Sequence, residues 1–288
     1  MSREIILAEP HGFCSGVRHA LQIAEKAVAE ASGSGPVFCL HELVHNRLVV
    51  DRLAAAGMIF VASLDEVPDG GTVLFSAHGV SPAVRDEAAR RGLRVIDATC
   101  VFVQKVHEAV RREASEGRTV LLVGSKSHDE VLGVSGEAPD AVIVIEDVKD
   151  AETVTVPDPA KVSLLTQTTL AAYQVEPIVA ILRKRFPALR IPDKSGICAA
   201  TTVRQEAVKA VAAKVPLVIV LGSRSSANSG RLVDVARAAG AKAELVPDIP
   251  SLREFIAANG LPDVIGLTAG ASTPEDVVRD AITVLRDA

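Results

Sequence analysis

Three of the four cysteines in this 288-residue chain are spaced almost evenly along it, at Cys14, Cys100 and Cys198. Each lies where a strand-like or helix-like run begins or ends. Thiolates bind soft metals, so three cysteines in such positions could share one centre. No two cysteines form a C-x-x-C pair, which argues against a zinc knuckle or a thioredoxin-type redox pair. The fourth, Cys39, lies inside an apolar run, as is typical of a buried small residue.

Two kinds of metal centre would use three thiolates. A zinc ion with three sulfur ligands and one nitrogen ligand is one alternative, although structural zinc sites usually draw their ligands from close pairs. A cubane iron–sulfur cluster normally has a thiolate at each iron, so three cysteines would leave one iron open as a Lewis acid. The residues alone leave both alternatives open.

Polar side chains follow most of the remaining strand-like runs. In open α/β sheets, ligands bind beyond the carboxyl ends of the strands, where helix N-termini present free N–H groups to anions. The residues in these positions are His45, Asn46, His78, His128, Glu130, Thr166 to Thr169, Ser223 to Ser229 and Ser272. They predict an anion-binding surface near the thiolates. A single histidine is more often structural, however, and the serine-rich run could be a loop with a helix N-cap.

Short β-branched runs alternate with amphipathic helical patterns along the whole chain. The predicted strands are Ile5 to Ala8, Val37 to Cys39, Met58 to Val61, Val73 to Phe75, Val95 to Asp97, Val120 to Val123, Val142 to Ile145, Val162 to Thr166, Val218 to Leu221, Ala243 to Val246 and Val264 to Thr268. The predicted helices include Val17 to Ala31, Pro82 to Arg91, Val103 to Ser115, Tyr173 to Phe186, Thr202 to Ala213, Arg231 to Ala239 and Pro274 to Leu285. Continuous apolar strands of this kind predict parallel sheets that helices cover on both faces.

The pattern predicts an α/β fold of three similar domains, each with a parallel sheet. The first domain covers residues 1–100 and contains Cys14. The second covers 101–197 and contains His128, Glu130 and the TQTT segment. The third covers 198–288 and contains Cys198 and the serine- and asparagine-rich loop.

Composition excludes several classes of function. The chain is 48% hydrophobic, which allows a large core, and its net charge of −5 and 3% aromatic content disfavour nucleic-acid binding. No apolar run reaches the roughly 18 residues of a membrane span, and the N-terminus does not resemble a signal peptide. We therefore expect a cytoplasmic protein with no membrane partner, whose cysteines serve as thiolates or metal ligands rather than disulfides.

A series of motifs carries a family resemblance along essentially the whole chain. In order, they are GFCSGV, HELVHN, FSAHGVS, DATC, SHDEV, TQTTL, ICAATTVRQEAV, GSRSSANS and TAGAS. Together they closely resemble the 4-hydroxy-3-methylbut-2-enyl diphosphate reductase (IspH/LytB) family. The resemblance implies three α/β domains around a central 4Fe-4S cluster. It also implies reductive dehydroxylation of an allylic diphosphate to isopentenyl and dimethylallyl diphosphates, the last step of the non-mevalonate (MEP) isoprenoid pathway.

The resemblance also implies roles for individual residues. Cys14, Cys100 and Cys198 would bind one 4Fe-4S cluster whose fourth iron stays open to substrate or water. The diphosphate would bind to His45, His78, His128, Ser226, Asn228 and Ser272. Catalysis would use Glu130 for proton delivery, with His128 and with Thr168 at the substrate hydroxyl, and Gln167 and Thr169 would support them. A ferredoxin or flavodoxin type protein would supply the electrons.

Burial of Glu130 beside a diphosphate would raise the pKa of its carboxyl through desolvation and like-charge repulsion, which makes proton transfer feasible at neutral pH.

Four positions depart from the family pattern, namely Val101, Asp129, Val203 and Ala227. Ala227 replaces a serine, so one hydroxyl contact to the diphosphate would be missing. Two other functions stay open: a diverged paralogue that reduces another allylic or phosphorylated alcohol, and a non-catalytic cluster protein that senses anions.

Overall fold

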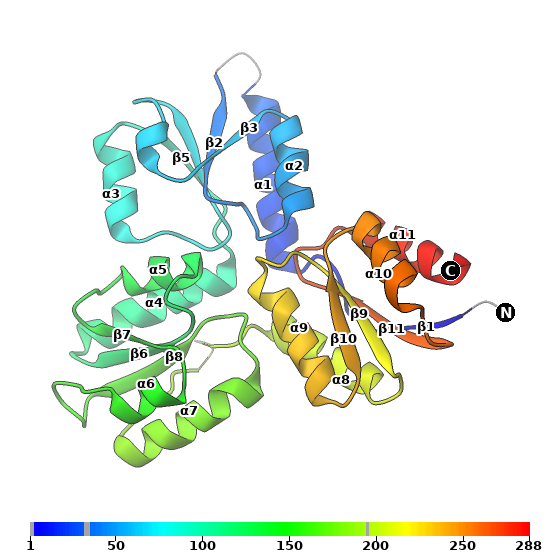
Figure 1. Cartoon of the computed structure of the whole chain (residues 1–288). Helices are drawn as coiled ribbons and strands as arrows, with labels where there is room; N and C mark the ends of the chain where they lie inside the picture. Colours follow the sequence, from blue (N-terminus) through cyan, green and yellow to red (C-terminus); the bar gives the residue numbers. More distant parts are fainter. Residues whose placement is uncertain (1–2, 32–34, 194–195) are drawn as a thin grey trace. The chain divides into compact units, whose positions relative to one another are not determined.

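The strands of this protein form three parallel sheets. The computed structural model describes residues 3–31, 35–193 and 196–288 (Figure 1). Within them the sheet orders are β3-β2-β4-β5, β7-β6-β8 and β1-β11-β9-β10. The pairings between neighbouring strands are parallel. The predicted α/β fold with parallel sheets is therefore confirmed.

The first sheet contains β2 (Val37–Leu40), β3 (Met58–Val61), β4 (Thr72–Phe75) and β5 (Arg94–Asp97). The helical elements of this part of the chain are α1 (Ser15–Glu30), α2 (Arg47–Ala55), the 3₁₀ turn η1 (Leu64–Glu66) and α3 (Pro82–Arg90). Val73 and Phe75 of β4 are fully buried and pack with Ala88 of α3. Because β4 is buried, it holds the start of the polar loop at residues 76–79 in place.

The second sheet contains β6 (Thr119–Val123), β7 (Val142–Ile145) and β8 (Val162–Thr166). Its helices are α4 (Val101–Ser115), α5 (Asp129–Ser135), α6 (Val148–Thr153) and α7 (Ala172–Arg185). Successive residues of a strand point to opposite faces. Leu121 accordingly packs with α6 and α7, whereas Leu122 packs with α4 and α5. Figure 1 shows these two pairs of helices on opposite sides of the sheet. Both faces are covered, as the continuous apolar strands predicted.

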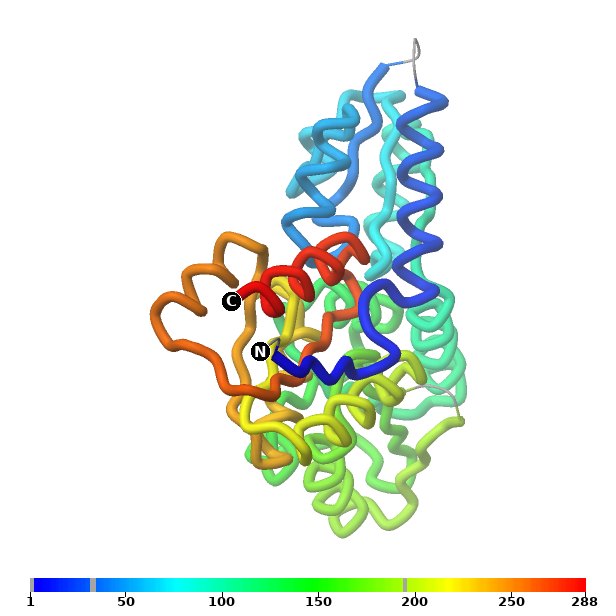
Figure 2. Tube along the Cα trace, turned by 90° about the vertical axis from the view of Figure 1, so that its right-hand side faces the viewer, coloured from blue at the N-terminus to red at the C-terminus, as the bar shows by residue number. Residues whose placement is uncertain are grey.

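The third sheet contains β1 (Glu4–Leu7), β9 (Leu217–Leu221), β10 (Lys242–Val246) and β11 (Val264–Ala269). Its helices are α8 (Ala199–Ala212), α9 (Ala227–Ala238), α10 (Ile249–Asn259) and α11 (Glu275–Asp287). Strand β1 pairs with β11, with Ile5 opposite Ile265, and Figure 2 shows the N-terminal strand beside the orange C-terminal one. The first strand thus joins a sheet built from the last third of the chain, which chain order alone does not reveal.

The chain divides into two compact units. One consists of Met1–Arg18, Val44–Asp51 and Ala199–Ala288 and contains the third sheet. The other consists of His19–Leu43 and Arg52–Cys198 and contains the first and second sheets. The three-domain boundaries expected at residues 100 and 197 stay a prediction.

Several helices begin earlier than their apolar pattern indicates. Helix α8 starts at Ala199 and not at Thr202, and α9 starts at Ala227 and not at Arg231. In α9 the first turn is closed by Ser226, whose side chain accepts a hydrogen bond from the backbone N–H three residues later. Polar residues at a helix start hide the apolar period, so a pattern search finds the second turn first. Among the described helices, none has the length and apolar character needed to cross a membrane.

Candidate functional site

Each of the three predicted ligand cysteines directly precedes a helix. Helix α1 begins one residue after Cys14, α4 one residue after Cys100, and α8 one residue after Cys198. The backbone N–H of Val17 points back to the Sγ of Cys14 at 3.4 Å. The positive end of a helix stabilises a nearby anion such as a thiolate. This shared position suits groups that bind metal as anions.

The fourth cysteine has the opposite environment. Cys39 lies inside β2 with no exposed surface, and burial raises the pKa of its thiol to about 12. The other three cysteines are only half-buried, and none of the four forms a disulfide within the described residues. Three accessible thiols at helix starts therefore fit the donor set of a soft metal centre, whereas Cys39 fits the buried small residue that its apolar run predicted.

The turn at residues 12–14, here called the Cys14 turn, is anchored to the end of β11. The N–H of Gly12 donates to the carbonyl of Ala269 at 3.2 Å, and the N–H of Cys14 donates to that of Ala271 at 3.1 Å. Gly12 has a φ of +63°, and a Cβ there would lie 3.2 Å from a carboxylate oxygen of Glu275. A glycine is therefore needed where the Cys14 turn closes on the sheet.

Three of the predicted anion-binding residues gather at the carboxyl end of the neighbouring strands β9 and β11. Ser226 caps α9, Asn228 lies in its first turn, and Ser272 follows β11 and donates to the carbonyl of His45 at 3.2 Å. A Cβ on Gly270 would lie 3.5 Å from the amide nitrogen of Asn228, which shows how closely the two loops approach. The structure thus joins these groups within one unit.

The amide of Asn228 is the most unusual polar group of this cluster. Its residue is 5% exposed, and both amide atoms are buried without a hydrogen-bond partner among the described residues. Buried polar groups normally have partners, because an unsatisfied one costs about 1–3 kcal/mol. The unused donor and acceptor of Asn228, beside the free N–H groups at the start of α9, suit a polyanionic ligand with bound water or hydroxyl groups.

In the other unit, the loops after β4 and β6 bring two predicted histidines together. The rings of His78 and His128 meet edge to face, with centroids 5.6 Å apart. The Oγ of Ser76 lies 3.3 Å from Nδ1 of His78. Asp129, one of the departures from the family pattern, places a carboxylate oxygen 3.9 Å from the same Nδ1. The Nδ1 of His128 accepts the N–H of Glu130 at 3.1 Å, so the hydrogen of that neutral ring is on Nε2.

Glu130 and Thr168 form a buried pair. Glu130 is 2% exposed, and its two carboxylate oxygens accept the N–H of Thr168 at 2.7 Å and the hydroxyl of Thr168 at 2.8 Å. Desolvation raises the pKa of Glu130 to about 7, although both hydrogen bonds from Thr168 oppose the rise. The carbonyl of Thr168 in turn accepts the N–H of Cys198 at 3.0 Å. One residue therefore links a titratable acid to a predicted metal ligand.

Gln167 and Thr169 flank this pair. The side-chain oxygen of Gln167 accepts the N–H of Ser125 at 3.1 Å, and its nitrogen donates to Oγ1 of Thr169 at 2.9 Å. Gln167 is 2% exposed. The first of these bonds ties the loop between β6 and His128 to the segment that follows β8.

One part of the site was not visible in the sequence. His107 of α4 carries no local sign of a role, yet it is 5% exposed and its Nδ1 lies 2.6 Å from Glu137. Burial lowers the pKa of His107, against the pull of the Glu137 carboxylate. A Cβ on Gly79, whose φ is +74°, would come within 2.8 Å of Nε2 of His107, and one on Gly133 would lie 3.2 Å from the Gly79 carbonyl. The Gly79 turn is thus fitted between α4 and α5.

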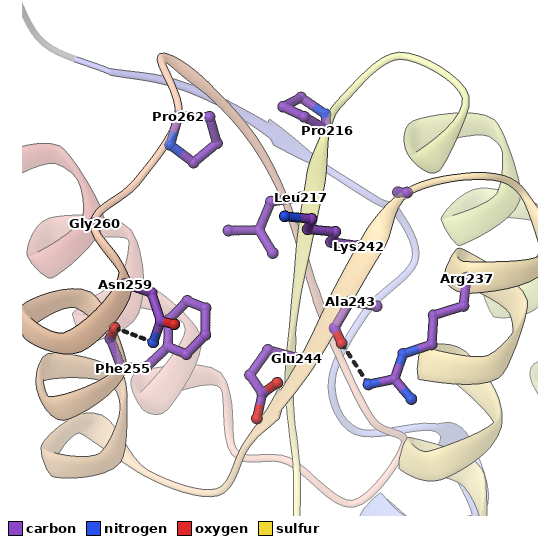
Figure 3. Close-up of a pocket in the computed structure, with 11 residues that line it drawn as sticks. Pro216, Leu217, Arg237, Lys242, Ala243, Glu244, Phe255, Asn259, Gly260 and Pro262 are labelled. Carbon is purple, nitrogen blue, oxygen red and sulfur yellow. Dashed lines mark hydrogen bonds between the residues drawn. The ribbon is translucent and has the colours of Figure 1, made fainter.

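A cavity of about 700 Å³ lies elsewhere, at the amino ends of β9 and β10 (Figure 3). Leu217, Lys242 and Phe255 line it, and Arg237 donates to the carbonyl of Ala243 beside it at 2.8 Å. Ligands of parallel sheets bind at the carboxyl ends of the strands. The cavity is at the wrong end of these strands to hold the predicted site residues.

The sequence matches one protein family along nearly its whole length. The model of the family "LytB protein" matches residues 5–286. A 4-hydroxy-3-methylbut-2-enyl diphosphate reductase of Aromatoleum aromaticum is 48% identical over 287 residues, which cover 99% of this chain and 90% of that protein. A protein of the same name from Mycolicibacterium vanbaalenii is 48% identical over 285 residues, or 99% of this chain and 84% of its own.

Solved structures agree with the sequence matches. The E-1-hydroxy-2-methyl-but-2-enyl-4-diphosphate reductase from Plasmodium falciparum has a TM-score of 0.93 at 36% identity, over 99% of this chain and 88% of that chain. An (E)-4-hydroxy-3-methyl-but-2-enyl diphosphate reductase, described as the terminal enzyme of the non-mevalonate pathway, has a TM-score of 0.69 at 31% identity, over 99% of this chain and 100% of that chain.

Proposed function

The chain belongs to the LytB protein family, and we propose that it reduces (E)-4-hydroxy-3-methylbut-2-enyl diphosphate to isopentenyl and dimethylallyl diphosphates. The reaction would remove the allylic hydroxyl as water, with two electrons and two protons. The relatives that carry this reductase name cover nearly the whole chain at 48% identity. The observation that carries the proposal is the buried Glu130–Thr168 pair, whose acid has a pKa of about 7 and is bonded through Thr168 to Cys198.

Cys14, Cys100 and Cys198 would hold one 4Fe-4S cluster with one iron free of thiolate. Their position before α1, α4 and α8 supports this choice, and the buried thiol of Cys39 is unsuited to be a fourth ligand. When bound, the cluster would supply the two electrons and an open iron for the substrate oxygen. A ferredoxin or flavodoxin type donor in the cytoplasm would deliver the electrons.

The diphosphate would bind to His45, His78, His128, Ser226, Asn228 and Ser272. The buried and unpartnered amide of Asn228 supports this assignment, because a phosphate oxygen would satisfy its N–H₂ group. The start of α9 adds free backbone N–H groups and a favourable dipole. His128 would use its Nε2–H, because its Nδ1 is engaged by the N–H of Glu130.

Glu130 would supply a proton so that the hydroxyl leaves as water. An ordinary glutamate is almost fully ionised at neutral pH, whereas a pKa of about 7 keeps about half of the Glu130 carboxyl groups protonated there. Thr168 holds the carboxyl with two hydrogen bonds and so fixes its direction. The diphosphate charge would raise the pKa of Glu130 further and favour the acid form.

The four departures from the family pattern leave this pair and the cysteines unchanged. Val101 and Val203 are 50% and 47% exposed, and neither is a proposed ligand. Ala227 is the first residue of α9, where a hydroxyl is missing beside Ser226 and Asn228. Asp129 adds a carboxylate 3.9 Å from His78. We therefore expect these four substitutions to change affinity for the diphosphate more than any other property.

Anaerobic purification followed by a turnover assay tests the function. We expect a brown protein with about four irons per chain that converts the named diphosphate when a strong one-electron reductant is supplied. A loaded protein that binds the diphosphate but reduces only another allylic alcohol would identify a diverged paralogue. A loaded protein that reduces no such alcohol would be an anion sensor, and a colourless zinc protein would refute all three.

A further inference from the structure

One buried arginine of α8 binds the backbone of the Cys14 turn as well as the backbone of its own helix. Arg204 of α8 is 5% exposed. Its Nη2 donates to the carbonyl of Gly12 at 2.9 Å, and its Nη1 donates to the carbonyl of Ala200 at 2.8 Å. Gly12 begins the Cys14 turn, and Ala200 is the second residue after Cys198 in the sequence. A single guanidinium therefore clamps the Cys14 turn to the first turn of α8.

Hydrogen bonds from two elements, β11 and α8, hold the Cys14 turn. The N–H groups of Gly12 and Cys14 bind carbonyls at the end of β11, and the carbonyl of Gly12 binds Arg204. Without Arg204, the turn would keep its contacts with β11 but lose the hydrogen bond from its Gly12 carbonyl to α8.

Arginine suits this role better than lysine does. Its guanidinium is planar and rigid, so two of its nitrogens reach two acceptors at a fixed separation, whereas an ammonium is a point charge on a flexible stem. Burying a charged side chain is costly unless hydrogen bonds compensate, and a neutral residue of similar size would avoid that cost. The presence of a buried arginine indicates that the clamp has a use beyond filling space.

We propose that Arg204 is a positioning residue that fixes the spacing between the Cys14 turn and the start of α8 which cluster binding requires. The inference rests on the proposed function, because it assumes that Cys14 and Cys198 are ligands of the same cluster. A ligand whose turn is free to move would leave the cluster more often. Arg204 would then govern how long the cluster is retained, and not only how stable the fold is.

The test compares cluster release with fold stability in Arg204→Met and Arg204→Lys. Each protein is purified anaerobically and reconstituted, and release of iron to a chelator is followed by the loss of cluster absorbance. The melting temperature of the cluster-free chain is measured in parallel. Losing a hydrogen bond from a charged group predicts release about tenfold faster in Arg204→Met. Arg204→Lys, which can keep one of the two bonds, should fall between Arg204→Met and the wild type.

Arg185 provides a matched control. Its two terminal nitrogens also bind two backbone carbonyls, those of Ala151 and Val154, but none of these residues is near a cysteine in the sequence. Arg185→Met should lower the melting temperature without changing the rate of iron release. Equal release rates in wild type and Arg204→Met, or equal acceleration in Arg204→Met and Arg185→Met, would overturn the inference. If Arg204→Met does not fold, Arg204→Lys decides by the same comparison with Arg185→Lys.

The wild-type chain separates this inference from the proposed function. A wild-type protein that holds no iron would refute the cluster, and the inference with it. A wild-type protein that holds about four irons, beside an Arg204→Met protein that releases them no faster, would refute the inference alone.

Discussion

Glu130 owes its raised pKa to burial rather than to any charged neighbour. Desolvation raises the pKa of its carboxyl from 4.5 to about 7, while both hydrogen bonds from Thr168 favour the ionised form. Burial therefore outweighs two good hydrogen bonds. The direction of this shift was predictable from the sequence. That Thr168 binds both carboxylate oxygens was not, because the two residues are 38 positions apart in the chain.

Replacing Glu130 with glutamine should separate chemistry from folding. Glu130→Gln keeps the shape and can still pair with Thr168, but it cannot donate a proton at neutral pH, so we expect turnover to fall by about 100-fold or more. Wild-type turnover should also fall as pH rises above about 7, where Glu130 ionises. The measurement is turnover against pH for both proteins. Near-normal turnover in the variant would remove Glu130 from the mechanism.

The same substitution should change how stability depends on pH. Since folding raises the pKa of Glu130 from 4.5 to about 7, the folded chain binds more protons than the unfolded chain between these values. The stabilisation from this group is therefore complete below pH 4.5 and is lost as pH rises to about 7, by about 3 kcal/mol in all. Denaturant titrations should show this loss in the wild type and a flatter profile in Glu130→Gln. Parallel profiles would contradict the raised pKa.

Cys39 should behave differently from the other cysteines. Because burial raises the pKa of its thiol to about 12, it carries almost no thiolate at neutral pH. We expect iodoacetamide to modify Cys14, Cys100 and Cys198 in the folded, cluster-free chain and to leave Cys39 unmodified, as peptide mass spectrometry would show. The matched variants are Cys39→Ala, which should keep its full iron content, and Cys100→Ser, which should not. Loss of iron from Cys39→Ala would make it a ligand.

At the scale of elements, the strands were predictable, whereas most helix starts were not; α3, which begins at the predicted Pro82, is an exception. The apolar, β-branched runs predicted β3, β7 and β8 at the residues where the structure has them, although only β8 is buried along its whole length. Helix α5 escaped prediction because it is only 7 residues long, too short to show a helical period. Its N-cap, His128, and its second residue, Glu130, are nevertheless site residues that motif comparison identified. The site residues were thus easier to predict from the sequence than the helix that contains them.

Gly79 is the element-scale position most sensitive to substitution. Gly79→Ala would strain a backbone with φ of +74° and would place a Cβ 2.8 Å from Nε2 of His107. The left-handed conformation alone costs about 1–2 kcal/mol. We expect Gly79→Ala to lose more free energy of unfolding than that and to bind the diphosphate more weakly, because His78 is the preceding residue.

Substitution of Gly92 separates the cost of the left-handed backbone from the cost of the clash with His107. Its φ is +62°, but a Cβ there would have no atom within 4 Å. Gly92→Ala should therefore show the backbone cost without the clash and should leave diphosphate affinity unchanged. Denaturant titrations and calorimetric binding of inorganic diphosphate measure both effects. Equal losses in the two variants would mean that His107 does not constrain the Gly79 turn.

At the scale of the whole molecule, the order of strands and the overall charge matter most. The pairing of β1 with β11 places the first and last strands of the chain side by side, and it depends on contacts between residues about 260 apart, as Ile5 and Ile265 show. No local pattern encodes such a pairing. The net charge of −5 disfavours long-range attraction of an anion, so a diphosphate would be held by the short-range donors at the ends of the strands.

Inorganic diphosphate should therefore stabilise the folded chain by binding to the hydrogen-bond donors at the ends of the strands. A ligand at 100 times its dissociation constant adds about 2.7 kcal/mol to the free energy of unfolding. We expect the melting temperature to rise by about 5 °C for a chain of this size.

Asn228→Ala should lose most of this rise in melting temperature. Without ligand the variant should be as stable as the wild type, because the substitution removes two buried atoms that have no partner among the described residues. Ser225→Ala, at an exposed position in the same loop, is the control and should keep the full rise. A rise of equal size in Asn228→Ala would show that the amide does not bind the diphosphate.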